Sequence, residues 1–565
     1  MSKRSLSPAQ LPPAKRLHVF GSSRPHAIHI LSFENSLYDE LILCIFSYLS
    51  WFDLCTTQAT SRNWARLAAD NELWREQYLK VYGRTRLRGA KGFFARLGDR
   101  DIKPLPGRAI RAELHKDWKW MFRISSNWRN GRCSVEECLD HSVDPPAPEG
   151  HVTTPSNRNE DHTHIILAGA LIITASSKPT HLPKMIITTQ SNQHHTISCY
   201  EKPLQDGPAS ITALALDQSP PPSGLLSISC FLSTGEFFVF EFNPSSPSHL
   251  PTRKYTYQPS RRNFHTFQAV YYHPLLVTVS DIFSLSIFDL SSGNVRLAQT
   301  LTSFTSYPPA SLVLSASSSI LFKLVVAYSI PVYPRHWSVG ATELMISKRS
   351  ESSGLGTSSS SSSFREDYRG SQTSTMVVIT TRTIRAFDVP SGFVDQASLR
   401  TMREQWGRKL LNVADTQTDG KWVIIAPGPG HHLNTRSNIS PSPSSTSPSS
   451  SLHSPTGLQL YRLVLPAQSS SVSASPPKLN FVRTLHGHTS PVSSLALADG
   501  RCVSLGLNGN IRVWDLEAGT SAEVAPADET MMDGILRPEK GSVSFDERRI
   551  VTARSGKVVI RRFDI

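Results

Sequence analysis

The sequence predicts a multidomain protein in which a small all-α module precedes a large all-β domain. Three observations predict this order. Apolar residues recur at helical spacing within residues 36–78, short β-branched apolar segments follow from about residue 164, and this second region repeats a pattern internally. At 565 residues the chain is too long for one compact core, so two or more domains with linkers are expected.

The net charge of +14 is concentrated in the first quarter of the chain. Residues 1–30 carry +5, residues 31–74 carry −4 and residues 75–132 carry +11, which leaves +2 for residues 133–565. The large β domain is therefore nearly neutral, and we expect no nucleic-acid partner for it.

Residues 1–30 are basic and rich in Ser and Pro, so we expect a disordered tail. Its PPAKRLH segment places Lys15 and Arg16 in a candidate nuclear import signal, and an ordinary basic tail explains them equally well. The seven cysteines form no CxxC pair, and no apolar run is long enough to span a membrane. We expect an intracellular protein of the nucleus, the cytoplasm or both.

Residues 36–78 predict three short helices. Ser36 with Asp39 resembles a capping box for the first helix, and Ser50 with Asp53 repeats the pattern for the second. The apolar positions are Leu41, Ile42, Ile45, Phe46 and Leu49 on the first helix; Leu54, Ala59, Trp64 and Leu67 on the second; and Leu73 and Trp74 on a third that starts after Asp70 or Asn71.

So small a helical module cannot bury all of these large side chains within itself. A partner must cover the surplus, and each covered Leu or Ile contributes about 1.5–3 kcal/mol. The alternative is a helical bundle packed on the protein's own β domain.

The pattern resembles an F-box, the module that docks on the Skp-family adaptor of SCF ubiquitin ligases. Matching segments include Glu40-Leu41, the run from Ile45 to Leu49, Asp53-Leu54 and Leu73-Trp74, whereas Tyr38 stands where the family usually has Pro. The resemblance implies an F-box over residues 31–82. It also implies that adaptor binding is made or supported by Leu37, Leu41, Ile45, Leu49, Leu54 and Trp64.

A helical linker is expected over residues 83–140, followed by a flexible, Pro-rich linker over residues 141–163. Within the first linker, Asn127-Trp128-Arg129 and Gly131 are similar to the NWR-G sequence that precedes the propeller in F-box/WD-repeat proteins. The resemblance implies that this linker holds the F-box at a fixed distance and angle from the propeller.

Residues 164–565 alternate short apolar runs with Ser, Pro and Gly clusters, which is typical of an all-β sandwich, barrel or propeller. Two Ser-rich tracts predict disordered loops near residues 350–373 and 433–456. The runs LSIFDLSSG (285–293), TIRAFDVPSG (383–392) and IRVWDLEAG (511–519) share one pattern, and FFVFEF (237–242) and VIRRFDI (559–565) are weaker copies. The repeat predicts a propeller of about seven blades, with eight as the alternative. We expect the last blade to be closed by a strand near residues 164–174.

The best copy of the pattern resembles a WD repeat, with Gly487-His488 followed by Trp514-Asp515. The family's hydrogen-bonded set of His, Ser/Thr, Asp and Trp corresponds here to His488, Ser504, Asn508 and Trp514. Because Asn508 replaces an Asp, its bond to His488 is expected to be weaker than a charge-assisted one.

No constellation for catalysis, metal binding or a cofactor is apparent, and GxSxG, P-loop and HExxH motifs do not occur. The PGPGHH segment (427–432) is expected to be a turn, since it lacks a Lys-Ser/Thr and a third metal ligand. Propeller receptors often bind extended peptides through arginines. The candidates for such a role are Arg261, Arg262, Arg382, Arg385 and Arg512. For each of them an ordinary position on the solvated surface or within a strand is the better explanation.

The resemblance to F-box/WD-repeat proteins implies a non-catalytic substrate-recognition subunit of an SCF-type ubiquitin ligase. Its F-box would bind the Skp-family adaptor, and through it cullin and RING subunits, while the propeller would bind a target protein. The alternative is a propeller scaffold tethered to the adaptor without a degradation substrate. An enzyme built on the propeller has no supporting residues.

Overall fold

A computed structural model describes most of the two regions that the sequence predicts as helical and as β structure. The described residues divide into two compact units, one that ends at Gln77 and one that begins at Tyr78. The described residues are 37–82, 117–139, 162–205, 207–220, 225–243, 251–259, 264–333, 335–350, 374–389, 392, 394–429, 456–465, 476–527, 540–554 and 556–565.

The first unit consists of short helices: α2 (Asp39–Phe46), α3 (Trp51–Thr57), α4 (Arg62–Ala68) and the beginning of a helix over 71–82. Ser50 caps α3 by accepting a hydrogen bond from the Asp53 amide, as predicted. Asp70 accepts from the amides of Glu72 and Leu73, which confirms the expected start of the last helix.

Two predictions for these helices were wrong. The N-cap of α2 is Tyr38, without a side-chain cap, and Ser36 lies outside the described residues. The single helix expected from Ser50 to Leu67 is two helices, because the Ser61 hydroxyl accepts from the Trp64 amide and starts α4 anew.

The core of this unit is built by side chains from every helix. Ile42, Phe46, Leu54, Leu67 and Trp74 are buried. Side chains also satisfy carbonyl groups that helix ends leave open: the Trp74 indole donates to the Ala68 carbonyl at 2.8 Å, and the Gln77 amide donates to the Leu49 carbonyl at 2.8 Å. These contacts fix how α2 presents its remaining surface.

The described residues of the second unit form seven antiparallel sheets of four strands each, so the prediction of about seven blades is confirmed. Blade 1 is formed by β2 (Thr163–Ala168), β3 (Leu171–Ser176), β4 (Lys184–Thr188) and β5 (His194–Ser198). Blade 2 is formed by β6 (Ile211–Leu216), β7 (Leu226–Leu232), β8 (Phe237–Phe242) and β9 (Thr252–Tyr257). Blade 3 is formed by β10 (Thr266–Tyr272), β11 (Leu275–Ser280), β12 (Ser284–Asp289) and β13 (Arg296–Thr302).

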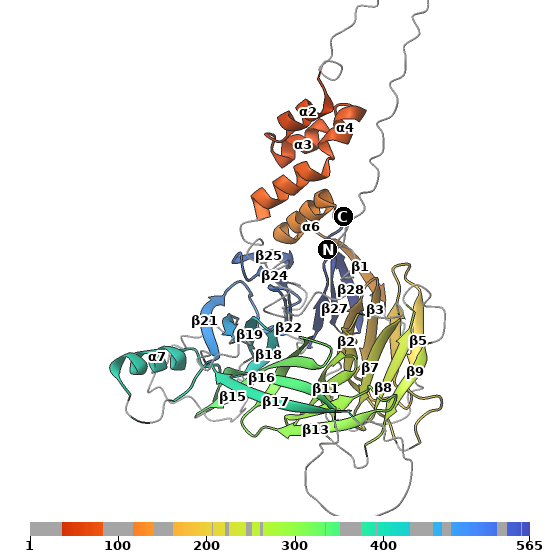
Figure 1. Cartoon of the computed structure of the whole chain (residues 1–565), viewed down its shortest axis with the longest axis vertical. Coiled ribbons are helices and arrows are strands. Elements are labelled where there is room, and N and C mark those ends of the chain that lie inside the picture. The colour runs from red at the N-terminus through yellow and green to blue at the C-terminus, as the bar shows by residue number, and fades with distance from the viewer. Residues whose placement is uncertain are drawn as a thin grey trace, which may run out of the picture. The chain divides into compact units, whose positions relative to one another are not determined.

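Blade 4 is formed by β14 (Tyr307–Ala316), β15 (Leu321–Val332), β16 (His336–Ser350) and β17 (Ser374–Arg385). Blade 5 is formed by β18 (Val413–Thr418), β19 (Trp422–Pro427), β20 (Leu458–Val464) and β21 (Lys478–Leu485). Blade 6 is formed by β22 (Val492–Ala498), β23 (Arg501–Gly506), β24 (Ile511–Asp515) and β25 (Thr520–Ala525). Blade 7 is β26 (Ser542–Phe545), β27 (Arg549–Arg554) and β28 (Lys557–Arg562), completed by β1 (Ser134–Leu139). Figure 1 shows these sheets within the second unit.

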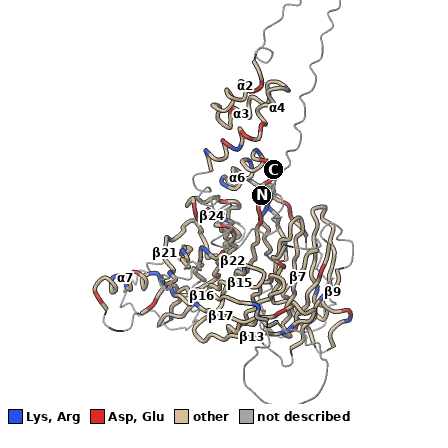
Figure 2. Tube along the Cα trace, viewed as in Figure 1, with Lys and Arg blue, Asp and Glu red and all other residues tan. Residues whose placement is uncertain are grey.

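The first strands of neighbouring blades lie beside one another from β2 around to β26, which returns to β2 and closes a ring. We call the face where the first strands begin the top face and the opposite face the bottom face, whatever the view in Figure 1. The described connections between blades and between second and third strands therefore lie on the top face. Lys, Arg, Asp and Glu are interspersed over the described blades, in keeping with their low net charge (Figure 2).

Blade 7 is completed by β1, which pairs with β28 from Ser134 opposite Arg562 to Leu139 opposite Lys557. The expectation that a strand near 164–174 closes the last blade is therefore wrong, because β2 and β3 open blade 1. The helical linker expected over 83–140 also ends earlier than predicted: α6 (Trp118–Asn130) is followed directly by β1.

Four of the five repeat copies occupy third strands, namely β8, β12, β24 and β28. The copy at 383–392 instead ends β17, a fourth strand. A helix that sequence periodicity missed, α7 (Gln396–Gly407), follows it, capped by Asp395. The tail, most of the flexible linker and nearly all of both Ser-rich tracts lie outside the described residues.

Candidate functional site

A second apolar stripe runs along α2, beside the stripe that forms the core. Tyr38, Leu41, Ile45 and Tyr48 follow one another at intervals of three and four residues, and 80, 51, 44 and 84% of their surfaces are exposed. Residues so spaced share one helix face. Trp51 and Phe52 at the start of α3 are exposed as well and meet edge to face at 6.0 Å. So much exposed aromatic and aliphatic surface marks an interaction site.

The predicted adaptor-binding residues fall into three classes of exposure. Leu41 and Ile45 are exposed, Leu37, Leu49 and Trp64 are half-buried, and Leu54 is fully buried. Leu54 can therefore support a docking surface only from beneath. Trp64 packs edge to face against Phe46 at 5.6 Å and so also lies behind the exposed stripe.

Sequence reasoning missed four exposed residues of this surface: Tyr38, Tyr48, Trp51 and Phe52. The spacing of the apolar residues from Tyr38 to Tyr48 could have predicted this surface. It follows the helical period, and Leu41 and Ile45 each directly precede a core residue, Ile42 and Phe46. An exposed ion pair between Asp39 and Arg66, 2.6 Å long, joins α2 to α4 beside the stripe.

In the second unit, the NWR-G segment anchors α6 to the propeller. The Asn127 amide donates to the Phe563 carbonyl at 2.8 Å, and the Trp128 indole donates to the Glu547 carbonyl at 2.9 Å. Gly131 ends the helix at φ +67°, and a Cβ there would lie 2.1 Å from the carbonyl oxygen of Glu523. Because Phe563 follows a third strand and Glu547 lies in a turn between first and second strands, α6 lies on the bottom face.

The predicted hydrogen-bonded set of blade 6 is only partly formed. The Ser504 hydroxyl lies 2.6 Å from Nε2 of His488 and accepts from the Trp514 indole at 2.8 Å. Asn508 instead donates to Thr489 and accepts from the Asn510 amide, so its expected bond to His488 is not among those of the described residues. Burial, together with Arg512, lowers the pKa of His488 to about 4, and the imidazole is neutral at physiological pH.

The arginines singled out as peptide-binding candidates do not converge. Arg382 pairs with the buried carboxylate of Glu343, and Arg512 pairs with Glu523 at 2.6 Å. Arg385 is exposed at the top of blade 4 and donates to the Thr305 hydroxyl. Arg261 and Arg262 lie outside the described residues, as do Lys15, Arg16 and the two histidines of PGPGHH.

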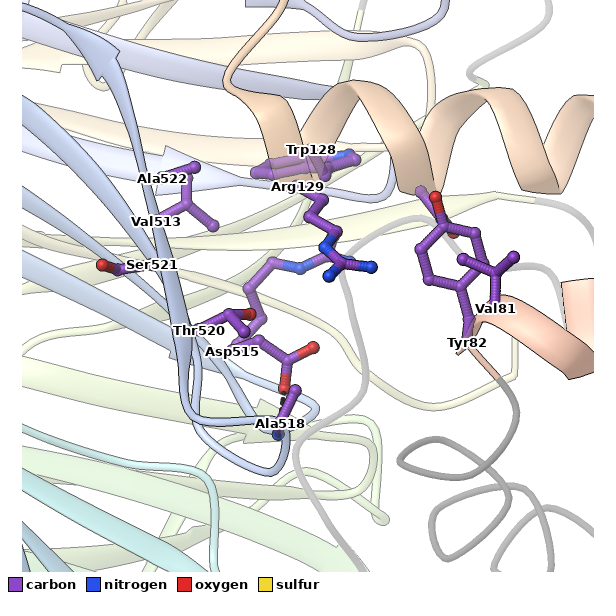
Figure 3. Close-up of a pocket in the computed structure, with 12 residues that line it drawn as sticks. Val81, Tyr82, Trp128, Arg129, Val513, Asp515, Ala518, Thr520, Ser521 and Ala522 are labelled. Atoms are coloured by element: carbon purple, nitrogen blue, oxygen red, sulfur yellow. Dashed lines mark hydrogen bonds between the residues drawn. The ribbon is translucent and has the colours of Figure 1, made fainter. Parts of the chain in front are cut away.

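A cavity of about 210 Å³ lies between the end of the helix over 71–82, α6 and the hairpin of β24 and β25. Figure 3 shows Arg129 and Asp515 pointing into the space that faces Tyr82. Two of the groups that line it have partners: Arg501 lies 4.3 Å from the centre of the Trp128 ring, and Asp515 accepts from two backbone amides. The cavity therefore lies at the packing interface between α6 and blade 6.

Metal ligation finds no support within the part of the chain that the structure describes. No three His, Cys, Asp or Glu side chains gather there in a way that could hold a metal ion. None of the described helices combines the length and the apolar character that crossing a membrane requires.

Two protein-family models match this chain. An F-box-like model covers residues 36–80, and the model described as F-box protein pof12 beta-propeller covers residues 163–540, more than half of the chain. The predicted resemblance to F-box proteins with propellers is therefore confirmed, and the matched ranges coincide with the helices of the first unit and with most of the blades.

Among curated proteins, the chain is similar to an F-box protein of Saccharomyces cerevisiae, with 29% identity over 139 residues, 22% of this chain and 21% of that protein. It is also similar to the probable E3 ubiquitin ligase complex SCF subunit sconB of Arthroderma otae, with 30% identity over 130 residues, 20% of this chain and 19% of that protein. The chain spans about a fifth of the length of these relatives.

Among solved structures, the Cps50 (Swd1) β-propeller domain of Myceliophteria thermophila aligns with a TM-score of 0.36 and 9% identity, over 73% of this chain and 98% of that chain. The WD40 propeller of Doa1 aligns with a TM-score of 0.34 and 13% identity, over 72% of this chain and 94% of that chain. The assignment of the propeller rests on its own seven sheets.

Proposed function

Because this chain belongs to the family of the F-box protein pof12 β-propeller, we propose that it is the substrate-recognition subunit of an SCF-type ubiquitin ligase. The F-box would dock on a Skp-family adaptor, and the adaptor would connect it to cullin and RING subunits. The propeller would hold the target protein. The chain would contribute proximity between target and ubiquitin-conjugating enzyme, without chemistry of its own.

The exposed stripe of α2 carries this proposal. Leu41 and Ile45 leave about half of their surfaces exposed although Ile42 and Phe46 already fill the core. Apolar side chains left in this arrangement are stabilised when a partner covers them, by roughly 25 cal/mol per Å² of area removed from water. The names of the two curated relatives, an F-box protein and an SCF subunit, support an adaptor as that partner.

Co-purification with the Skp-family adaptor tests the docking half of the proposal. The double variant Leu41→Asp/Ile45→Asp is expected to lose the adaptor, because binding would bury two carboxylates without partners. Ala59→Asp/Ala69→Asp is the matched control, since both alanines are exposed outside the stripe and adaptor binding should persist. Thermal unfolding of the propeller should be the same in both variants. Retention of the adaptor by Leu41→Asp/Ile45→Asp would disprove the assigned surface.

The recruiting half requires a different measurement. Proteins bound by the full chain are captured while the proteasome is inhibited, and their half-lives are then compared in cells with and without the chain. A receptor predicts at least one bound protein whose half-life lengthens when the chain is deleted, and also when Leu41→Asp/Ile45→Asp replaces it. Bound proteins whose half-lives never change would favour the scaffold.

A further inference from the structure

We propose that the top of blade 4 binds an extended, acidic segment of the target protein that carries a large apolar side chain. This inference rests on the proposed function and names the class of segment that the propeller recognises. The surface, here called the rim patch, consists of Phe304, Tyr307, Tyr333, Trp337 and Leu411, with the cations Arg335, Arg385 and Lys409 around it.

Strand order brings these residues to one face. Phe304 and Tyr307 lie where β13 leads into β14, Tyr333 and Trp337 lie at the hairpin of β15 and β16, and Leu411 precedes β18. The β15–β16 hairpin also extends beyond β14 on this face. The pairing of β14 with β15 begins at Tyr307 and Ser329, whereas the pairing of β15 with β16 continues to Val332 and His336. The second and third strands of blade 4 thus project farther on the top face than its first strand does.

Part of the rim patch is held in place by contacts among residues of blade 4 and the segment before β18. The rings of Tyr307 and Trp337 meet edge to face at 5.5 Å. Trp337 and Leu410 exchange two backbone hydrogen bonds, of 2.7 and 2.8 Å, which hold the segment before β18 against β16. On the same face Phe304 is 89% exposed, Tyr333 88% and Leu411 58%. Exposed aromatic groups held on a rigid base are the usual anchors of protein interfaces.

The charges around the rim patch select the partner. Arg335 and Arg385 are exposed, and within the described part of the chain neither they nor Lys409 is in an ion pair. Arg385 donates only to the neutral hydroxyl of Thr305, and Lys409 lies 3.9 Å from the Trp406 ring centre. Arg382, lower on the same strand, is by contrast paired with Glu343. Unpaired cations beside apolar anchors favour an acidic segment.

The rim patch also lies on the face that α6 leaves open. Trp128 of α6 contacts Phe545 and Phe563, both at the bottom of blade 7. A target segment on the top of blade 4 therefore does not compete with α6 for surface.

The test uses the full chain co-expressed with the Skp-family adaptor as bait for a phage-displayed library of random peptides, each about 16 residues long so that it can span an interface of standard size. Enriched peptides are expected to carry net negative charge and at least one large aliphatic or aromatic residue. Synthetic versions should bind Phe304→Ser/Tyr333→Ser at least about tenfold more weakly, and should bind Arg335→Glu/Arg385→Glu more weakly by a factor that shrinks at high salt.

Matched controls lie on the bottom face. Ile320, 56% exposed in the turn between β14 and β15, is changed to Ser, and the exposed Arg296 is changed to Glu. Neither change should alter peptide affinity. Peptides without acidic character, equal binding to Phe304→Ser/Tyr333→Ser, or no enrichment would overturn the rim patch. If the rim patch binds peptides but no captured protein changes its half-life, the patch stands and the proposed ligase function fails.

Discussion

Trp128 of α6 stacks face to face on Phe563, near the C-terminal end of the chain, with ring centres 3.9 Å apart and planes 11° apart. Arg501 covers the same indole at 4.3 Å, and only 3% of the Trp128 surface is exposed. α6 and β1 come before blade 1 in the sequence, whereas Phe563 follows the last strand. The stack therefore fastens both ends of the propeller's chain together.

Replacing Trp128 by Ala is expected to lower the unfolding free energy of the propeller by about 3–5 kcal/mol, the usual cost of removing a buried Trp side chain. Trp128→Phe keeps an aromatic ring on Phe563 but loses the hydrogen bond to the Glu547 carbonyl, and should cost less than half as much. Urea unfolding followed by fluorescence measures both. Equal losses for the two variants would show that the hydrogen bond, and not the stack, carries the stability.

Gly131 and Gly169 form a matched pair, because both have positive φ angles, +67° and +59°, in the second unit. An Ala Cβ would meet the Glu523 carbonyl oxygen at 2.1 Å at position 131, but nothing within 4 Å at position 169. Gly169→Ala should cost only the backbone strain, about 1–2 kcal/mol. Gly131→Ala should cost at least about 2 kcal/mol more, because α6 must move away from β25. Urea unfolding of both variants tests the difference, and equal costs would contradict the close approach.

Local signals in the sequence predicted part of the local structure. The Ser50–Asp53 cap, the start of a helix at Asp70 and the bond between Ser504 and the Trp514 indole all follow from residues close together in the chain. The register of the F-box was predictable for the same reason, since core and surface residues of α2 are set by helical spacing alone.

Long-range pairing was not predictable. β1 is a short strand whose partner β28 lies at the far end of the chain, and its residues carry no signal of that pairing. The exposed side chains of the rim patch come from several separate connections, and only the ring of blades brings them together. The expected bond between Asn508 and His488 is not among those of the described residues, where the Asn508 side-chain oxygen accepts from the Asn510 amide and its nitrogen donates to the Thr489 hydroxyl.

Protonation of His488 is expected to destabilise blade 6 in acid. Burial lowers its pKa in the folded protein to about 4, whereas an ordinary His titrates near 6.5. Between these values the unfolded chain binds the additional proton, so stability falls as pH drops from about 6.5 to 4 and is insensitive to this group above that range.

The variant His488→Gln should therefore show a shallower loss of unfolding free energy between about pH 6.5 and 4.5, by up to about 1.4 kcal/mol per pH unit. His164 in β2, whose pKa burial also lowers to about 4, remains in the variant, so part of the slope persists. Urea unfolding at several pH values provides the measurement. An unchanged slope would mean that His488 takes up no proton on unfolding in this range.

Arg549 is the group whose removal should affect the closure of the ring most directly. Its side chain is only 3% exposed; it pairs with Asp546 at 2.9 Å and donates to the carbonyls of Gly169, Ala170 and Leu171 in the hairpin of blade 1. Arg549→Met leaves a buried carboxylate and three carbonyls without this partner, so a loss of about 3–5 kcal/mol is expected.

Because Arg549 bridges blades 7 and 1, hydrogen exchange should accelerate first in β27 and in the β2–β3 hairpin, where the ring closes. Arg549→Met/Asp546→Asn should recover part of the stability, since the neutral amide oxygen still accepts from the backbone amides of positions 548 and 549 without a buried charge. Arg296→Met, at an exposed position, is the control and should change stability by less than about 0.5 kcal/mol. Uniform acceleration of exchange in all seven blades would show that Arg549 stabilises the propeller as a whole and not the junction between its first and last blades.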